Sequence, residues 1–167
     1  MSVKVYRASR DQIELAYGIV REYYEAAAVV ARDEPQDFAK QYFGACAGVW
    51  LAEDENRVIG CVALRRLEEL PGSGEIKRMY LRPQYRGRGT SDLLLDSLED
   101  YARTCGYQWL YLDTAADMVA AARFYKRKGF VVCGRYNRNP QAAIFMRKTI
   151  GQESATAAGV GGGGSLC

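Results

Sequence analysis

Histidine is absent from the 167 residues of this chain. Its absence excludes Ser-His-Asp and Cys-His nucleophiles, histidine-ligated metals and histidine acid–base chemistry. Any proton transfer must therefore use Glu, Asp, Tyr, Lys or Cys. The five cysteines are widely spaced and form no CxxC pair, so we expect reduced thiols, no metal and no redox pair.

Long apolar runs are also missing. No run approaches the roughly 18 apolar residues of a membrane span, and the N-terminal segment has no apolar signal core. We therefore expect a soluble, cytoplasmic protein without a membrane partner.

Charge is distributed unevenly along the chain. Residues 1–75 contain 9 Lys and Arg against 13 Asp and Glu, whereas residues 76–150 contain 14 against 6. The two parts carry net charges of −4 and +8. A basic second half suggests an anionic partner: a nucleotide, a phosphorylated cofactor, nucleic acid or a membrane surface.

The composition predicts one domain over residues 1–150, because 49% of the chain is hydrophobic and 26% is charged. Residues 151–167 hold six of the 17 glycines and almost no large apolar side chains. We expect this segment to be a flexible tail, since it cannot offset its ordering entropy by burial.

Apolar periodicity predicts helices alternating with strands, and hence helices on both faces of a mixed, mostly antiparallel sheet. This arrangement is an α+β fold, a three-layer α/β/α sandwich. The predicted strands are 3–7, 50–53, 57–64, 75–81, 109–112, 130–133 and 142–146, and the predicted helices are 11–31, 33–44, 91–105 and 118–128.

The strongest local signal is Arg82-Pro-Gln-Tyr-Arg-Gly-Arg-Gly-Thr-Ser91, which lies between a strand and a helix. Such a turn exposes backbone N–H groups, and the helix start adds unpaired N–H groups and a favourable dipole. With three arginines and no acidic residue from Ile76 to Ser91, the segment favours a polyphosphate ligand. It is neither a P-loop nor a dinucleotide loop. The alternative is a basic turn that binds nothing.

Gln84-Tyr-Arg-Gly-Arg-Gly89 resembles the Q/R-x-x-G-x-G/A signature of the GCN5-related N-acetyltransferases (GNAT). The resemblance extends over roughly residues 3–149, through segments in the family's order and spacing. The chain resembles in particular a group of small bacterial members of unassigned substrate. The supporting segments are Gly60-Cys-Val-Ala-Leu-Arg65, Glu75-Ile-Lys-Arg-Met-Tyr-Leu-Arg-Pro83, Leu112-Asp-Thr114, Ala121-Ala-Arg-Phe-Tyr-Lys-Arg-Lys-Gly-Phe130 and Asn139-Pro140.

The resemblance implies a GNAT-like fold and a site for acetyl-CoA. The backbone of Met79, Tyr80 and Leu81 would bind the pantetheine arm like an added strand. Met118 stands where many relatives have an asparagine that contacts this arm. The pyrophosphate would lie on the loop and helix start: Arg86, Gly87, Arg88, Gly89, Thr90 and Ser91.

The resemblance also implies two catalytic residues. Tyr125 would protonate the departing thiolate as a general acid, and Glu75 would accept a proton from the amine directly or through water. Both have structural alternatives: Tyr125 also fits the apolar stripe of its helix, and Glu75 can pair with Lys77 or with an arginine across the sheet.

We therefore expect an acetyl-CoA-dependent N-acetyltransferase in which a bound amine attacks the thioester directly. The acceptor is a small-molecule amine or a protein amine, and the chain is a monomer or a homodimer. The alternative is a non-catalytic acyl-CoA-binding or regulatory module of the same fold. Nucleic-acid binding is not expected, because no aromatic platform accompanies the basic cluster. The acceptor pocket is expected to involve Tyr23, Tyr24, Phe38, Tyr42, Tyr136 and Asn139.

Overall fold

The computed structural model describes residues 2–151, so nearly all of the predicted tail lies outside the described residues. A seven-stranded sheet forms its centre, in the order β1-β2-β3-β4-β5-β7-β6. All neighbouring strands are antiparallel except β4 and β5, which are parallel. The strands are β1 (Lys4–Arg7), β2 (Gly48–Asp54), β3 (Arg57–Arg66), β4 (Ser73–Leu81), β5 (Trp109–Thr114), β6 (Val131–Val132) and β7 (Ile144–Thr149).

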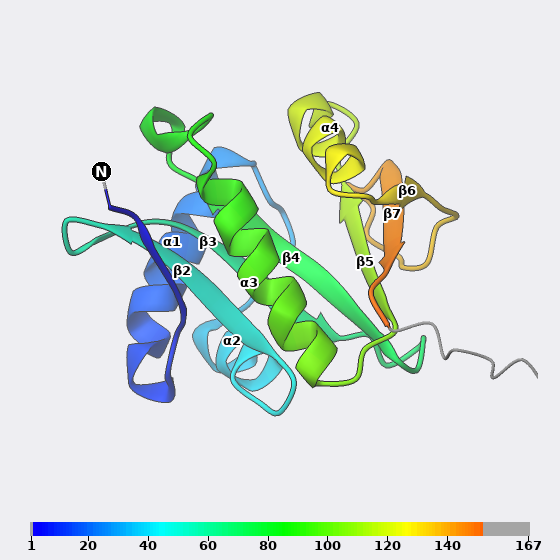
Figure 1. The fold of residues 1–167 in the computed structure, drawn as a ribbon, viewed down its shortest axis with the longest axis horizontal. Helices are drawn as coiled ribbons and strands as arrows, with labels where there is room; N and C mark the ends of the chain where they lie inside the picture. The colour runs from blue at the N-terminus through cyan, green and yellow to red at the C-terminus, as the bar shows by residue number, and fades with distance from the viewer. Residues whose placement is uncertain (1, 152–167) are drawn as a thin grey trace, which may run out of the picture.

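Helices cover both faces of this sheet. Helix α3 crosses one face, and α1 and α2 lie behind the opposite face (Figure 1). The predicted three-layer α+β architecture is therefore confirmed. The helices are α1 (Ile13–Ala26), α2 (Pro35–Tyr42), α3 (Thr90–Thr104) and α4 (Val119–Arg127), with 3-10 turns at Arg10–Gln12 and Pro83–Tyr85.

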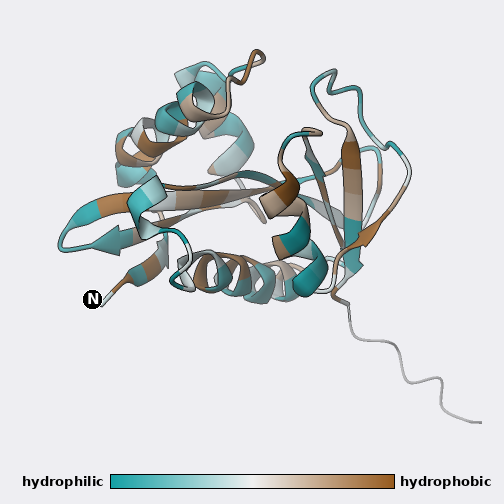
Figure 2. Ribbon diagram, turned by 90° about the horizontal axis from the view of Figure 1, so that it is seen from above, coloured by the Kyte–Doolittle hydropathy of each residue, from teal (hydrophilic) through white to brown (hydrophobic). Residues whose placement is uncertain are grey.

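Two apolar cores flank the sheet because side chains alternate along its central strands. Trp50 and Val62 pack toward α3, while their neighbours Leu51 and Cys61 pack toward α1 and α2. Figure 2 shows the helix layers on either side of the sheet, with hydrophobic residues concentrated along the strands between them.

The ends of several elements differ from the predictions. The first helix stops at Ala26 instead of continuing to residue 31, and Ala28 has a left-handed φ of 49°. The last strand runs to Thr149 rather than to residue 146, because its register with β5 continues to Trp109. The β2–β3 hairpin is confirmed; its turn residues Glu55 and Asn56 both have positive φ, as in a type I′ turn.

Candidate active site

Strands β4 and β5 pair over three residues and then separate. Residues 73–75 pair with residues 109–111 in parallel register. Beyond Glu75, β4 pairs only with β3, while β5 continues along β7. Figure 1 shows the two strands meeting at one end and diverging toward α4. The sheet is therefore open along residues 76–81, and an extended ligand can hydrogen-bond to this edge like an added strand.

A β-bulge in β4 borders this opening. Lys77 pairs with Ala63 of β3, and Tyr80 pairs with Cys61. Two residues of β4 therefore lie opposite a single residue of β3. Arg78 adopts a φ of 57°, which residues other than glycine rarely take. The extra residue places Lys77 and Arg78 on the same side of the strand, toward α1 and α2, whereas Ile76 and Met79 belong to the core beneath α3. Two consecutive cationic side chains thus reach one face.

The three residues predicted to bind the pantetheine arm lie on the open edge. Met79 and Leu81 pack toward α3, and Tyr80 packs toward α1. Arg86 Nε donates a hydrogen bond of 2.9 Å to the carbonyl oxygen of Leu81. This contact ties the glycine-containing loop to the end of the open strand.

The predicted phosphate-binding loop leads directly into α3. Gly87 and Gly89 have left-handed φ values of 74° and 81°, and Gly89 is the N-cap residue of the helix. Because glycine offers no side chain to cap the helix, the first N–H groups of α3 are available to an anion. Arg88 is exposed, Thr90 is buried and Ser91 is half-buried at this helix start.

Helix α4 is held beside the start of α3 by ion pairs. Asp92 lies 3.4 Å from Arg127 Nη2 and 3.5 Å from Lys128 Nζ, and Lys128 also lies 2.7 Å from Asp96. The basic end of α4 therefore flanks the opening near the phosphate-binding loop.

Tyr125 on α4 packs between aromatic rings. Its ring centroid lies 5.2 Å from that of Phe124 and 5.4 Å from that of Phe130, and its side chain is almost fully buried. Burial, together with the nearby hydroxyl of Tyr23, raises the pKa of Tyr125 above its ordinary value. Tyr125 belongs to the core beneath α3 and Tyr23 packs on the α1 side.

Glu75 stands where the two strands begin to separate, and its side chain has no exposed surface. Its Oε1 accepts hydrogen bonds from Arg65 Nε at 2.8 Å and lies 2.7 Å from Arg65 Nη2. Its Oε2 lies 3.3 Å from Asn137 Nδ2 and 3.7 Å from Lys77 Nζ. The cross-strand arginine expected as the structural alternative is thus present, while Oε2 has only long contacts.

Asp113 on β5 joins the same cluster, although the sequence analysis assigned it no role. Lys77 Nζ lies 3.3 Å from its Oδ2, and Asn139 donates to it at 3.4 Å. Asn137 makes a short hydrogen bond to the same oxygen. Asp113 lies within the segment Leu112-Asp-Thr114 that supported the family resemblance, but its partners are 24 to 36 residues away in sequence. Only the fold brings them together.

A second cluster surrounds Asp33 in the segment between α1 and α2. Arg78 Nη2, Tyr24 Oη and Gln41 Nε2 each donate to its carboxylate at 3.0 Å. Burial favours a higher pKa for Asp33, but the hydrogen bond and charge of Arg78 outweigh it and hold the pKa below its ordinary value. Gln41 Oε1 accepts a hydrogen bond of 2.7 Å from Arg65, so this cluster is continuous with that of Glu75. We call the joined clusters the buried polar network: Asp33, Gln41, Arg65, Glu75, Lys77, Arg78, Asp113, Asn137 and Asn139.

The six side chains predicted to line the acceptor pocket differ in their placement. Phe38 is fully buried among other aromatic side chains of the core, and its place in an acceptor pocket stays a prediction. The other five lie beside or within the buried polar network: Tyr23, Tyr24, Tyr42, Tyr136 and Asn139.

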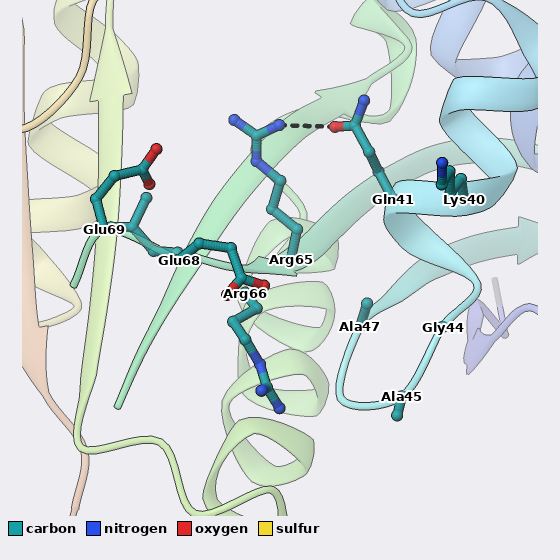
Figure 3. A pocket seen from close by; sticks show the side chains of 10 residues that line it. Lys40, Gln41, Gly44, Ala45, Ala47, Arg65, Arg66, Glu68 and Glu69 are labelled. Atoms are coloured by element: carbon teal, nitrogen blue, oxygen red, sulfur yellow. Dashed lines mark hydrogen bonds between the residues drawn. The ribbon is translucent and has the colours of Figure 1, made fainter. Parts of the chain in front are cut away.

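A hollow of about 540 Å³ lies next to this network at the end of α2 (Figure 3). Arg65 forms part of its wall and is hydrogen-bonded there to Gln41. Lys40, Arg66, Glu68 and Glu69 supply further charged groups to its lining. Neither Glu75 nor Tyr125 lines the hollow. Arg65, which does line it, donates a hydrogen bond to Glu75.

Residues 2–151 contain no group of three or more side chains that could together hold a metal ion. In the same part of the chain, no helix is both long and apolar enough to cross a membrane.

Comparison with known proteins places this geometry in a family. Residues 14–130 match the Acetyltransferase (GNAT) family. An uncharacterized N-acetyltransferase of Schizosaccharomyces pombe is 36% identical over 108 residues, which are 63% of this chain and 66% of that protein. The matched stretch spans between 52% and 66% of the length of the first curated relatives.

Solved structures share the fold over nearly their whole length. An acetyltransferase of the GNAT family from Staphylococcus aureus superposes with a TM-score of 0.76 at 17% identity, covering 89% of this chain and 99% of that chain. The yncA protein of Salmonella typhimurium, solved with its cofactor acetyl-CoA, gives 0.71 at 18% identity, covering 95% and 99%. Since the family match spans most of the sequence and the separated strands and glycine loop are in place, the chain belongs to the GNAT acetyltransferase family.

Proposed function

We propose that this chain transfers the acetyl group of acetyl-CoA to a primary amine, which attacks the thioester directly. The observation that carries the proposal is the opening between β4 and β5. The phosphate-binding loop lies at the end of its open strand, and Glu75 and Tyr125 border it. The acceptor is a small-molecule amine or a protein amine.

The residues around the opening fit a coenzyme A thioester. Acetyl-CoA supplies the activated acetyl group. The free edge at Met79–Leu81 binds the pantetheine arm, and the loop from Arg86 to Ser91 binds the pyrophosphate. Added Cβ atoms at Gly87 and Gly89 would meet nothing within 4 Å, so a phosphate can approach this backbone closely.

Glu75 serves as the proton acceptor for the attacking amine. An alkylammonium group has a pKa of about 10.4 and must lose a proton before it can attack. Arg65 holds Glu75 Oε1, so Oε2 is the oxygen that receives the proton, directly or through water.

Tyr125 serves as the proton donor to the departing sulfur. Its raised pKa keeps the phenol protonated at neutral pH. Burial disfavours a phenolate at this place, and it also disfavours a free thiolate. The proton of Tyr125 therefore moves to the sulfur of coenzyme A as the thioester C–S bond breaks.

Oligomeric state, cellular compartment and nucleic-acid binding complete the proposal. We expect a monomer or a homodimer that acts in the cytoplasm without a nucleic-acid partner. The cytoplasmic expectation is supported by the free thiols of the four described cysteines.

An acceptor screen tests the proposed function. The purified full chain is incubated with acetyl-CoA and a panel of primary amines, and thiol release is measured together with product mass. We expect amine-dependent thiol release and a product heavier by one acetyl group. Calorimetric binding of acetyl-CoA without transfer to any amine would instead support the non-catalytic module.

A further inference from the structure

The two oxygens of the Glu75 carboxylate have different surroundings. Oε1 lies 2.8 Å from Arg65 Nε and 2.7 Å from Arg65 Nη2, so one guanidinium on β3 holds it through two short contacts. Oε2 lies 3.3 Å from Asn137 Nδ2 and 3.7 Å from Lys77 Nζ, and both of these nitrogens also contact Asp113 on β5. The carboxylate is therefore oriented with Oε1 toward β3 and Oε2 toward the strand across the opening.

Arg65 is itself held from α2. Its third nitrogen, Nη1, donates a hydrogen bond of 2.7 Å to Gln41 Oε1, drawn as a dashed line in Figure 3. Gln41 Nε2 in turn donates at 3.0 Å to Asp33 Oδ1. All three nitrogens of the guanidinium are thus engaged, two with Glu75 and one with Gln41. Because the guanidinium is planar, it cannot rotate without breaking at least one of these contacts.

The hollow beside α2 shows why this support matters. The side chain of Arg65 is 34% exposed, whereas that of Glu75 has no exposed surface. A long, partly exposed side chain gains entropy when it is released, and the hollow of about 540 Å³ that Arg65 lines gives it room to turn. The charge of Arg78 also opposes that of Arg65, although Asp33 is paired with Arg78. Gln41 therefore stabilises the orientation in which Arg65 contacts Glu75.

We infer that Gln41 and Arg65 are positioning residues for the proposed base. Gln41 fixes Arg65, and Arg65 fixes Glu75 with Oε2 toward the opening. This inference rests on the proposed role of Glu75 and adds one residue of α2 and one of β3 to the site. Proton transfer depends steeply on geometry, since a misplacement of about 1 Å can lower a rate about 10²-fold. The loss of Gln41 should therefore lower kcat and leave acetyl-CoA binding unchanged.

Gln41→Met tests the inference, because methionine keeps the length of the side chain and removes its amide. The full chain is assayed with acetyl-CoA and the primary amine used most efficiently in the acceptor screen. We expect kcat to fall about 10- to 100-fold, with an unchanged Kd for acetyl-CoA in calorimetry. Gln36→Met is the matched control, since Gln36 is exposed on the same helix and its variant should keep the wild-type kcat. A wild-type kcat in Gln41→Met would overturn the inference.

A double-mutant cycle separates positioning from a general structural effect. Glu75→Gln removes the base but keeps an oxygen for Arg65, and kcat should fall by about 10²- to 10⁴-fold. Because Gln41 acts through Glu75, adding Gln41→Met should cause no further fall. Equal losses in both backgrounds would overturn the inference and leave the acetyl transfer intact. Wild-type turnover in Glu75→Gln would overturn the proposed base, and the absence of acetylation with every amine would overturn the transfer itself.

Arg65→Lys keeps the positive charge and loses the planar fork. A single ammonium cannot reproduce both contacts with Glu75 and the contact with Gln41, so kcat should fall about tenfold. Arg66→Lys is the control and should keep the wild-type kcat, because Figure 3 shows the side chain of Arg66 pointing away from Gln41. A wild-type kcat in Arg65→Lys would show that the fork is not needed and would contradict the inference.

Side-chain NMR provides a readout that does not depend on turnover. The Nε–H group of Arg65 donates to Glu75, so its exchange with water reports how firmly the two residues are joined. We expect this exchange to be at least tenfold faster in Gln41→Met than in the wild type, and unchanged in Gln36→Met. Equal exchange in all three proteins would show that Gln41 does not hold Arg65, and the inference would be wrong.

Discussion

Glu75 and Tyr125 are held at the opening by different forces. Glu75 is fixed by Arg65 and by the amide of Asn137, so its position depends on charge and hydrogen bonding. Tyr125 is fixed by ring packing against Phe124 and Phe130, which does not involve its hydroxyl. Removing that hydroxyl therefore tests chemistry with little structural disturbance.

Tyr125→Phe should lower kcat by about 10²- to 10⁴-fold, the range that a positioned proton donor contributes. The Kd for acetyl-CoA should change little, because the ring packing remains. Steady-state kinetics and calorimetry measure the two quantities. Tyr101→Phe is the control, since Tyr101 packs against Trp50 on another part of the sheet. Wild-type turnover in Tyr125→Phe would remove this residue from the mechanism.

The loop between β4 and α3 joins an open strand to a helix that lacks a side-chain cap. Gly87 needs a left-handed backbone, yet an added Cβ would meet no atom within 4 Å. A substitution there would act through backbone strain rather than through a clash. Gly106, at the other end of α3, has a similar φ of 79° and equally open surroundings, so it provides a matched position.

Gly87→Ala and Gly106→Ala should each lose about 1 to 2 kcal/mol of unfolding free energy, the cost of a left-handed alanine. Only Gly87→Ala should weaken acetyl-CoA binding, by about tenfold, because strain there shifts the N–H groups that meet the pyrophosphate. Urea denaturation and calorimetry give the two values. If Gly87→Ala bound acetyl-CoA as tightly as Gly106→Ala, the loop would not be the phosphate site.

At the scale of the whole molecule, buried tyrosines gather around the opening and the buried polar network. Burial raises the pKa of Tyr24 to about 12, although Arg78 acts in the opposite direction. Burial likewise raises the pKa values of Tyr42, Tyr125 and Tyr136. The folded protein therefore retains these phenolic protons at a pH where the unfolded chain has lost them.

Stability should consequently fall in alkali. Unfolded tyrosines ionise at about pH 10, so the contribution of these protonated phenols is complete below that pH. It is then lost as the pH rises from about 10 toward the raised pKa values of the folded state. Urea denaturation at several pH values, with tyrosinate absorbance, measures the effect. Tyr42→Phe should flatten the decline, whereas titration of all tyrosines near pH 10 without unfolding would contradict it.

Local patterns predicted most of the elements. The β2–β3 hairpin and α3 depend on turn residues and on periodicities that lie within a few neighbouring positions. The first helix was predicted too long because the apolar spacing continues to Val30, which is 80% exposed in the fold. Its chain turns away instead, which places Asp33 beside Arg78.

The candidate site was only partly predictable for the same reason. Glu75, Tyr125 and the loop residues stand in segments with recognisable order. Asp113 also stands in such a segment, but its role and that of Asn137 were missed because their contacts join residues 24 to 62 positions apart. The bulge at Arg78 leaves no sequence signal either, since it arises from pairing with a second strand.

The sequence by itself determined the available chemistry: without histidine, proton transfer passes to carboxylates and phenols, and the glycines with their arginines predict an anion site at a helix start. These are local properties of residue type and spacing. Only the tertiary structure decided where β4 leaves β5, that two cations share one face, and that Gln41 and Glu75 contact the same arginine. Each of these depends on contacts between distant segments, which the residues of one segment cannot specify alone.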